Sequence, residues 1–471
     1  MKKMFRTLAA LTLAASLAGC GGGSGGGQAA AGSSAAQGQE NARESAGDQA
    51  DAQKSAGDQA DSADQSNAAD QAGEVTLTIA SAMVTEKPEG DLEQELADKY
   101  MELHPNVKIE FISMPAAEVS KRIVTMATGD NLPDMFFVPN DFMPQLYDLD
   151  IVADLEGLLG EEWLSGYNPN LLKDAKINGR MMSIPWYASP YAVIYRTDWF
   201  EELGLEIPET WDEFLEVSKA LTRDTDGDGQ VDKWAFSMVG SRNNSGEQRF
   251  VLFSKSFGAD EIYEKEGKWA TDIGTEQFKA GLKYFTDLYT EHGVVPPGPT
   301  EVDYSASMEL FTSEQTGMIL SGPHSLGFIT TTNPGLEGKL GSFVIPKGEA
   351  HVSISGIGGY AISESCENKN VAADYMKFIT SKENAIYFGQ KTGRMPTRTE
   401  ASDDPYFSSV LFKGFLGALD YAVDPETFAQ YPALLDTIGE AYSNVLSGVA
   451  TFDEAYGTLV EKSAALIEAE N

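Results

Sequence analysis

The stretch that most constrains the fold runs from Ile184 to Phe214 and reads IPWYASPYAVIYRTDWFEELGLEIPETWDEF. Pro185 and Pro190 prevent a continuous helix in its first half, because proline lacks the backbone N–H that a helix requires. The β-branched and aromatic residues there favour extended backbone. In the second half, Thr210 and Glu213 have the spacing of a capping box, which predicts that a helix begins directly after Thr210. We interpret the stretch as a strand that crosses between two folded bodies, followed by a helix of the second body.

Strand and helix patterns alternate on both sides of this crossing. Ahead of it, strands are predicted at Val75–Ile79, Val107–Phe111 and Met135–Val138, with helical patterns between them. After it, strands are predicted at Trp234–Val239 and Gly317–Leu320. Such alternation is typical of an α/β fold in which helices cover both faces of mainly parallel sheets.

The length of 471 residues is too great for one compact core and predicts two lobes. The apolar run at Ser353–Ser363 contains closely spaced glycines and predicts a return crossing. A third crossing is expected near Gly393–Thr397. We therefore assign residues 74–186 and 356–394 to an N-terminal lobe, and residues 187–355 and 395–471 to a C-terminal lobe.

The first 73 residues have a different character from the rest of the chain. Residues 1–19 combine a basic start with a short apolar run, which is typical of a secretory signal peptide and too short to span a bilayer. Residues 20–73 are rich in Gly, Ser, Ala, Gln and Asp and repeat the sequence SAGDQAD, so they cannot bury a core. We interpret them as a disordered tether.

The run LAGC, which ends at Cys20, resembles the lipobox of bacterial lipoproteins. This resemblance implies that Cys20 becomes the lipidated N-terminus and holds the protein outside the cytoplasm, on the cell membrane. An ordinary signal peptide with a chance cysteine is the alternative. The second cysteine, Cys366, then has no partner for an intramolecular disulfide.

The charge of the chain excludes one class of partner. A formal net charge of -38, from 72 acidic and 34 basic side chains, argues against nucleic acid, which is bound by clustered Lys and Arg. The four histidines show no metal-ligand spacing with one another or with the cysteines. No catalytic constellation is visible either, so we expect that the protein is not an enzyme. We also expect a monomer.

Five segments, in their order and spacing, carry a family resemblance: LPDMFFVPND, IPWYASPYAVIYRTDWFEELG, IPETWDEFLEVSKALT, TGMILSGPHSLG and GRMPTR. The chain resembles the extracellular solute-binding proteins of bacterial ABC importers, in the carbohydrate class (family 1) that includes maltose-binding protein. The resemblance spans nearly all of residues 74–471. It implies a two-lobed, periplasmic-binding-protein-like fold of type II, with several hinge crossings and a sugar held between the lobes. It also implies that the closed form docks on permease subunits in the membrane.

A sugar site needs flat apolar faces for the C–H side of the ring and polar groups for its hydroxyls. Trp186, Tyr187 and Tyr191 lie at the first crossing and are candidates for such faces, although each taken singly fits a core position equally well. Asp141 follows a predicted strand and matches the family position of a hydroxyl acceptor, with a loop cap as the alternative. Two further candidates for hydrogen bonds to the ligand are Asn140 and Ser189.

Two more candidates lie at family motifs. His324 follows Gly-Pro, where family members usually carry an aromatic residue that stacks on the sugar. Arg394 could donate a fork of hydrogen bonds to a hydroxyl or a uronic carboxylate, while a helix-end or interlobe salt bridge is an equally good interpretation.

A calcium loop is predicted at DTDGDGQVD, residues 224–232. Oxygen ligands fall at positions 1, 3, 5 and 9 of the loop, and a glycine stands at the sharp-turn position 6. Ala235 replaces the glutamate of a complete EF-hand, so we expect a structural Ca²⁺ site of the truncated kind that relatives carry; a solvated acidic turn is the alternative. The predicted ligands are Asp224, Asp226, Asp228, Gln230 and Asp232.

These features predict a lipid-anchored receptor that captures a sugar or oligosaccharide and delivers it to an ABC permease. A secreted glycan-degrading hydrolase, with carboxylates distant in sequence, is one alternative. A subunit that presents bound sugar to a signalling receptor and a receptor of the same fold for a non-sugar solute are two others. The scarcity of clustered basic residues argues against a highly anionic ligand.

Overall fold

The structure is a computed structural model that describes residues 73–115, 118–139, 142–423 and 428–471. The predicted signal peptide, the lipidation site Cys20 and all of the tether except Gly73 lie outside the described residues. The candidates Asn140 and Asp141 also lie outside them.

The first of two main sheets contains six strands. Strands β1, β2, β3 and β6 run in one direction, while β14 and β15 run in the opposite one. Four of the six strands therefore run in the direction that the predicted parallel sheet requires. The two strands that enter the sheet after later crossings, β14 and β15, pair antiparallel with their neighbours. The order across the sheet is β15 (Met395–Pro396), β6 (Ile184–Ala188), β14 (Gly358–Ile362), β3 (Met135–Pro139), β1 (Val75–Ser81) and β2 (Val107–Ser113).

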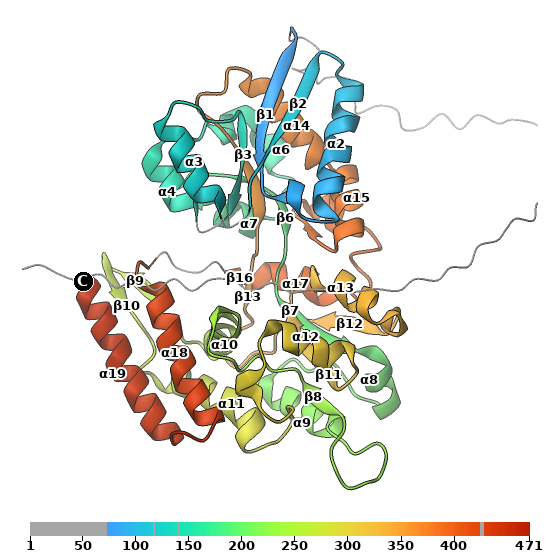
Figure 1. Cartoon of the computed structure of the whole chain (residues 1–471), viewed down its shortest axis with the longest axis vertical. Coiled ribbons are helices and arrows are strands. Elements are labelled where there is room, and N and C mark those ends of the chain that lie inside the picture. Colours follow the sequence, from blue (N-terminus) through green and yellow to red (C-terminus); the bar gives the residue numbers. More distant parts are fainter. Residues whose placement is uncertain (1–72, 116–117, 140–141, 424–427) are drawn as a thin grey trace, which may run out of the picture. The chain divides into compact units, whose positions relative to one another are not determined.

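Helices cover both faces of the first sheet (Figure 1). Helix α2 leads from β1 outward to β2, and α3 leads back past β1 to β3, so right-handed connections place these two helices on opposite faces. The helices around this sheet are α2 (Glu89–Leu103), α3 (Val119–Thr128), α4 (Met143–Leu149), α5 (Leu155–Leu159), α6 (Glu161–Leu164), α7 (Pro169–Asp174), α14 (Lys369–Ile379), α15 (Lys382–Thr392) and α16 (Thr399–Ser402).

The second main sheet contains four strands. Strand β7 runs antiparallel to both of its neighbours, and the other three strands run the same way. The order is β12 (Leu340–Phe343), β7 (Ala192–Arg196), β11 (Thr316–Ser321) and β8 (Trp234–Phe236). The two-stranded sheets pair β4 (Lys176–Ile177) with β5 (Arg180–Met181), β9 (Tyr263–Lys265) with β10 (Lys268–Ala270), and β13 (Ser353–Ile354) with β16 (Ala422–Val423).

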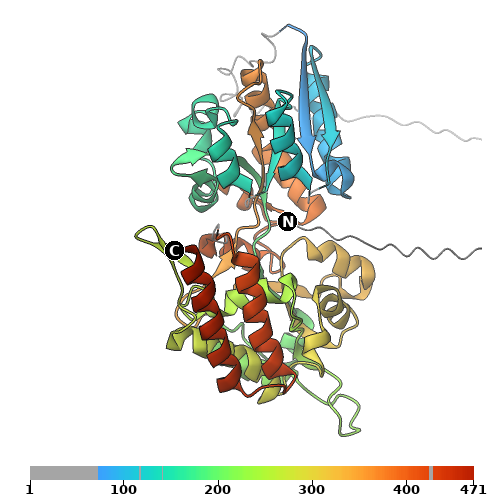
Figure 2. The ribbon, with the colours of Figure 1, turned by 60° about the vertical axis from the view of Figure 1, so that its left-hand side comes forward.

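The helix predicted to begin after Thr210 is confirmed. Its capping box is complete: the Glu213 N–H donates to Thr210 Oγ1 at 3.3 Å, and the Glu213 carboxylate accepts the Thr210 N–H at 3.1 Å. Figure 2 shows the last two helices side by side. The helices associated with the second sheet are α8 (Thr197–Leu203), α9 (Trp211–Leu221), α10 (Asn244–Ser256), α11 (Glu276–Thr290), α12 (Tyr304–Thr312), α13 (Ser325–Thr332), α17 (Lys413–Ala418), α18 (Tyr431–Leu446) and α19 (Phe452–Glu470).

The chain passes between the two main sheets close to the predicted crossings, but two lobe boundaries need correction. The boundary drawn after Trp186 falls inside β6, because β6 stays in the first sheet through Ala188. The boundary drawn after Arg394 is also too early, since Met395 pairs with Ala188 in the first sheet. The return crossing precedes β14 as predicted, and its Gly356 has a φ of 54°. A Cβ at Gly356 would lie 2.6 Å from the Ser189 carbonyl oxygen, so this close approach requires glycine.

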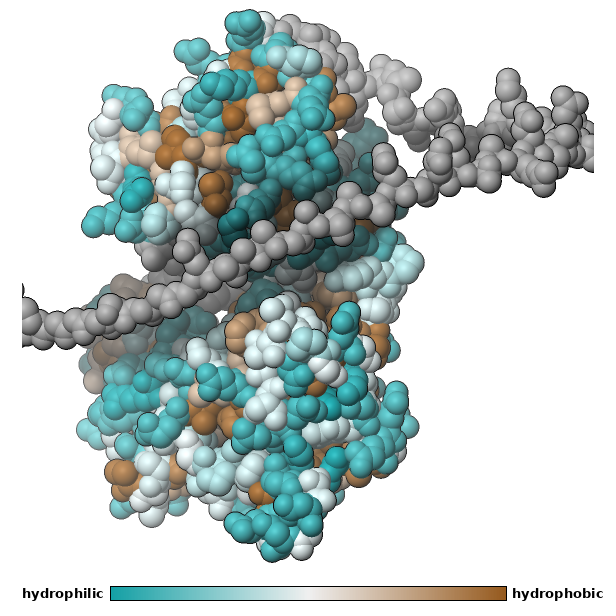
Figure 3. All heavy atoms as spheres, turned by 45° about the vertical axis from the view of Figure 1, so that its right-hand side comes forward, coloured by the Kyte–Doolittle hydropathy of each residue, from teal (hydrophilic) through white to brown (hydrophobic). Residues whose placement is uncertain are grey.

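Each main sheet has a hydrophobic core of its own, and a third apolar cluster spans residues of β7, β11, α12, α13 and α17. The face seen in Figure 3 is mainly hydrophilic, with apolar side chains scattered among polar ones. Within the described part of the chain, no helix combines the length and the apolar character that a membrane crossing demands.

Candidate functional site

Three loops meet beside the first crossing. Ser189, directly after β6, donates its N–H to the Ser355 carbonyl at 3.1 Å. Its hydroxyl oxygen accepts a hydrogen bond from Arg394 Nη1 at 2.9 Å. Gly393 approaches the loop before α13 so closely that a Cβ there would lie 2.7 Å from the Pro323 carbonyl oxygen. The structure thus brings the predicted residues Ser189 and Arg394 together with the turn that carries His324.

On the side of the first sheet, Arg394 is held by an ion pair. Its Nη2 lies 3.2 Å from the Glu89 carboxylate, and its guanidinium lies 4.6 Å from the centre of the Tyr187 ring. Burial raises the pKa of Tyr187 to about 12, so its hydroxyl stays protonated. Burial, and then the charge of Glu89, raise the pKa of the neighbouring Glu86. Arg394 therefore forms a salt bridge at a helix end, because Glu89 is the first residue of α2, and this ion pair lies within the first lobe and not between the lobes. The guanidinium fork is largely occupied.

Trp186 does not lie where the sequence suggested. It is 2% exposed, and its ring packs 4.3 Å from Phe388 and 5.8 Å from Tyr360, inside the core of the first sheet. The prediction that its face covers a sugar ring is contradicted, because no face of the indole is available to a ligand. Every residue of β6 is buried, so the strand has no polar face on which alternation could mark an accessible position.

On the side of the second sheet, His324 lies beside Tyr304 and Ser321. The Tyr304 hydroxyl is 2.9 Å from Ser321 Oγ and 3.5 Å from His324 Nε2. Burial, and to a smaller extent the charges of Arg394 and Arg249, lower the pKa of His324 to about 4. The imidazole is therefore neutral at physiological pH and offers one donor and one acceptor.

Arg249, on α10, lies close to two tyrosine rings. Its guanidinium carbon is 4.4 Å from the centre of the Tyr304 ring and 5.2 Å from that of Tyr191. Its Nε donates to the Leu320 carbonyl at 3.1 Å, and its Nη1 donates to the Ser245 carbonyl at 2.8 Å. The predicted residue Tyr191 and the residue Tyr304 thus both lie at cation–π distance from the Arg249 guanidinium.

The sequence did not point to Glu89, Arg249 or Tyr304. Glu89 follows the carboxyl end of β1, and ligands of such sheets bind at the carboxyl ends of strands. The same reasoning that selected Asp141 after β3 could therefore have selected Glu89. Tyr304 begins α12 directly after the N-cap Asp303. Arg249 stands inside a helix with no motif around it, and no sequence signal marks it.

The Asp-rich loop brings three of its predicted ligands together. Carboxylate oxygens of Asp224, Asp226 and Asp232 lie within 4.8 Å of one another. The Asp224 carboxylate accepts the N–H groups of Gly229 and Gly227, both at 2.7 Å, and these bonds lower its pKa. The two glycines have φ values of 89° and 80°, in the left-handed region that the sharp turn requires. Grouped carboxylate oxygens are the donor set that Ca²⁺ prefers, so these residues fit the ion.

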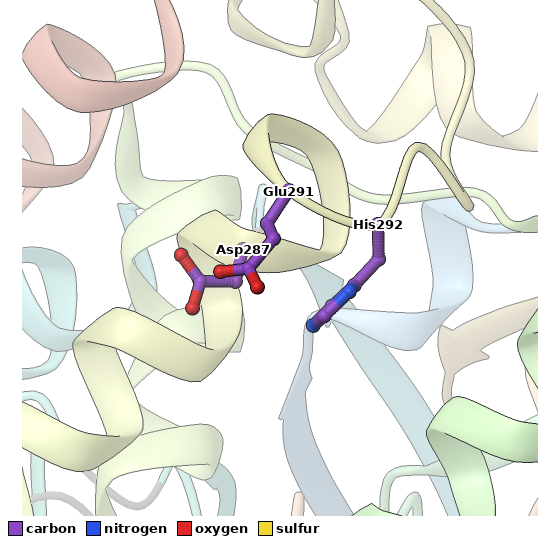
Figure 4. A group of neighbouring side chains, drawn as sticks. All are labelled: Asp287, Glu291 and His292. Atoms are coloured by element: carbon purple, nitrogen blue, oxygen red, sulfur yellow. The ribbon is translucent and has the colours of Figure 1, made fainter.

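The other two predicted ligands are not part of that group. The Asp228 carboxylate accepts the Gln230 N–H at 2.8 Å within its own turn. A second group, formed by Asp287, Glu291 and His292, lies at the C-terminal end of α11 (Figure 4). Its Asp287 carboxylate already binds Lys283 Nζ at 2.5 Å, so we interpret this group as a surface ion-pair cluster.

The chain is similar to several known proteins. It is 24% identical over 350 residues, 71% of this chain and 76% of the relative, to the diacetylchitobiose binding protein DasA of Streptomyces coelicolor. A shorter similarity, 34% over 137 residues, links 27% of this chain to 26% of the lipoprotein LipO of Bacillus subtilis. The solved structure of the sugar-binding protein MalE from Xanthomonas citri has a TM-score of 0.71 at 19% identity, covering 84% of this chain and 98% of that one.

The structural similarity confirms the predicted α/β fold of two lobes, the fold of MalE-like periplasmic binding proteins. The family model described as bacterial extracellular solute-binding protein matches residues 84–386, which include every strand from β2 to β14. The resemblance drawn from the five sequence segments is thereby confirmed. This chain belongs to the family of bacterial extracellular solute-binding proteins.

Proposed function

We propose that this protein captures a saccharide outside the cytoplasm and delivers it to the permease of an ABC importer. The observation that carries the proposal is the cluster beside the crossings. There Tyr191 and Tyr304 offer partly exposed rings, while His324, Arg394 and Ser189 offer donors and acceptors. Rings that cover C–H faces and fixed polar groups that pair with hydroxyls are what a sugar site requires.

The names of the relatives support the same class of ligand. DasA is named for diacetylchitobiose and MalE for sugar, and both align with most of this chain. We further propose that Cys20 carries a lipid that anchors the protein to the cell membrane. The LAGC run and the similarity to the lipoprotein LipO support this anchor.

We also propose that the Asp-rich loop holds a structural Ca²⁺ ion through Asp224, Asp226 and Asp232. Carboxylates within 4.8 Å of one another repel, and a divalent cation removes that repulsion. The loop joins α9 to β8 and belongs to the scaffold, so its ion supports stability and takes no part in ligand contact.

The experiment is a thermal-shift screen of the purified protein, with calcium present, against mono- and oligosaccharides, amino acids and polyamines. A ligand that binds only the folded state raises the melting temperature in a saturable way. We expect saturable shifts from one related group of saccharides. If amino acids or polyamines alone produce them, the saccharide proposal is wrong.

The hits are then titrated against two variants. Tyr304→Ala removes a ring of the site, and we expect it to weaken binding about tenfold. Tyr263→Ala, on the β9–β10 hairpin, is the matched control and keeps the wild-type affinity. Chromatography of the same mixtures tests the hydrolase alternative, because a binding protein returns the oligosaccharide intact.

A further inference from the structure

Among the buried arginines of the described residues, Arg249 differs from the other two. Arg196 and Arg398 are 2% and 5% exposed, and each has a carboxylate partner. Arg196 pairs with Asp198 at 2.6 Å, and Arg398 pairs with Glu400 at 2.9 Å. Arg249 is 5% exposed but pairs with no carboxylate of the described residues. A buried cation without a counter-ion is costly, so this exception calls for an explanation.

The described residues hold this guanidinium in place without a counter-ion. Two backbone carbonyls accept from Nε and Nη1, and the rings of Tyr191 and Tyr304 both lie at cation–π distance. The remaining nitrogen, Nη2, has no hydrogen-bond partner in the described part of the chain and is not sealed from solvent. Nη2 is therefore a positively charged donor for which the described residues supply no acceptor.

This donor belongs to the candidate site and not to a separate surface. Tyr304, which stacks on Arg249, also reaches His324 with its hydroxyl, and Gly322 beside His324 lies against the Ser189 carbonyl oxygen. The second arginine of the site, Arg394, is occupied by Glu89 and Ser189. Arg249 is thus the cation that the site leaves unpaired among its described residues.

We infer that Arg249 binds a carboxylate of the ligand, and that the captured solute is an acidic saccharide of the uronate class. This inference rests on the proposed saccharide function. A carboxylate carries a charge opposite to that of the guanidinium, so it adds Coulomb attraction to the hydrogen bond that a neutral sugar hydroxyl lacks. The single free edge of the guanidinium suits a monoanionic carboxylate better than a phosphate, which needs more donors. The rings beside it suit the C–H faces of the same sugar residue.

The test compares ligands that differ only in charge. Isothermal titration calorimetry of the full protein measures the affinity for galacturonate and glucuronate disaccharides, their methyl esters and the corresponding neutral disaccharides. For at least one series we expect the free acid to bind at least about tenfold tighter than its ester, with a preference that shrinks at high salt. This comparison uses the wild-type protein and does not depend on how any variant folds.

Variants then assign the preference to one side chain. Arg249→Gln removes the charge, and we expect the ratio of acid to ester affinity to fall to about one, while Arg249→Lys retains part of it. Arg242→Gln is the matched control. This arginine lies just before α10 and pairs with Asp436 at 2.8 Å, so its loss leaves the ratio unchanged.

Each outcome decides the inference. Equal binding of acid and ester, or a preference for neutral saccharides, overturns the uronate assignment and leaves the saccharide function standing. An acid preference that survives in a folded Arg249→Gln variant overturns the role of Arg249. If no saccharide of any kind binds, the proposed function falls and the inference falls with it.

Discussion

The two sides of the candidate site handle charge differently. On the side of the first sheet, Arg394 pairs with Glu89, and a deeper carboxyl, Glu93, accepts hydrogen bonds from Ser81 and Tyr360. On the side of the second sheet, Arg249 lies at cation–π distance from two tyrosine rings without a carboxylate partner among the described residues. Among the described residues, the charged groups named on the first side therefore have partners, whereas the second side has an arginine without a counter-ion.

This difference separates stability from recognition. Interactions that are complete without a ligand contribute to the free energy of unfolding whether or not ligand is present. A donor that lacks its partner contributes mainly when the partner arrives. Substitutions on the first side should therefore lower stability, and substitutions on the second side should change affinity.

The largest expected effect comes from Trp186→Ala. Removing a buried indole leaves a cavity, and such changes cost about 3 to 5 kcal/mol of stability. Chemical denaturation should show this loss, while the affinity of the folded variant changes less than about threefold. Tyr191→Ala is the comparison from the second side and should lose affinity more than stability. A Trp186→Ala variant that is stable but does not bind ligand would instead support the original prediction that the indole contacts the ligand.

The next effect concerns the ion pair of the first side. Arg394→Gln leaves the buried Glu89 carboxylate without its partner, which costs about 3 kcal/mol, at the lower end for a broken buried pair. The double variant Glu89→Gln/Arg394→Gln should recover most of that loss, because neither charge remains. A double variant that is as unstable as the single one would show that the two groups are not energetically coupled.

A pH-dependent effect is expected from Glu93. Burial raises the pKa of this carboxyl from 4.5 to about 7 in the folded protein. The folded state then holds a proton that the unfolded state releases, so stability falls as pH rises from about 4.5 to about 7. We expect a contribution of about 2 to 3 kcal/mol, removed in Glu93→Gln. Denaturation of both proteins at pH values across that window measures it, and parallel profiles would contradict it.

His324 should make stability rise with pH, which is opposite to the effect of Glu93, and its contribution to stability should be smaller. Its pKa falls from 6.5 to about 4 in the folded protein, so the unfolded state binds the proton first. Stability is complete above about pH 6.5 and is lost as pH falls toward 4, by about 1 kcal/mol because the side chain is partly exposed. The variant His324→Gln should flatten the acid side of the profile only. A loss on the alkaline side would contradict this assignment.

The smallest effect is expected at the Asp-rich loop, which belongs to neither side. Removing calcium with a chelator should lower stability by about 1 kcal/mol and leave ligand affinity unchanged. The melting temperature of the Asp224→Asn variant should equal that of the chelator-treated wild-type protein, and adding chelator to the variant should not change it. An unchanged melting temperature of the wild-type protein in chelator would argue against the metal.

Much of the scaffold could be read from local patterns. The capping box of Thr210 and Glu213 is a relation between residues three apart, and it formed as predicted. The strand at Val75 followed from its alternation of apolar and polar residues, and the strand at Met135 from its apolar run. These signals work because a capping box joins residues close in sequence, and because the pattern of apolar residues records which faces of a strand are buried.

The site was only partly predictable. Ser189 and Arg394 could be proposed because they stand at crossings, yet the exact ends of the crossings depended on the pairing of Met395 with Ala188. Trp186 was misplaced because its strand is buried on both faces. A strand of that kind carries no period from which an accessible side could be inferred.

The sequence by itself determined the α/β class, the family and the approximate crossings, since all three depend on local periodicity and on motifs at a fixed spacing. Only the tertiary structure decided that Arg249 lies close to Tyr191 and Tyr304 and that Arg394 pairs with Glu89. These partners come from segments far apart in the chain. Contacts of that kind depend on how sheets and helices pack, and no local pattern encodes which distant charge remains without a partner.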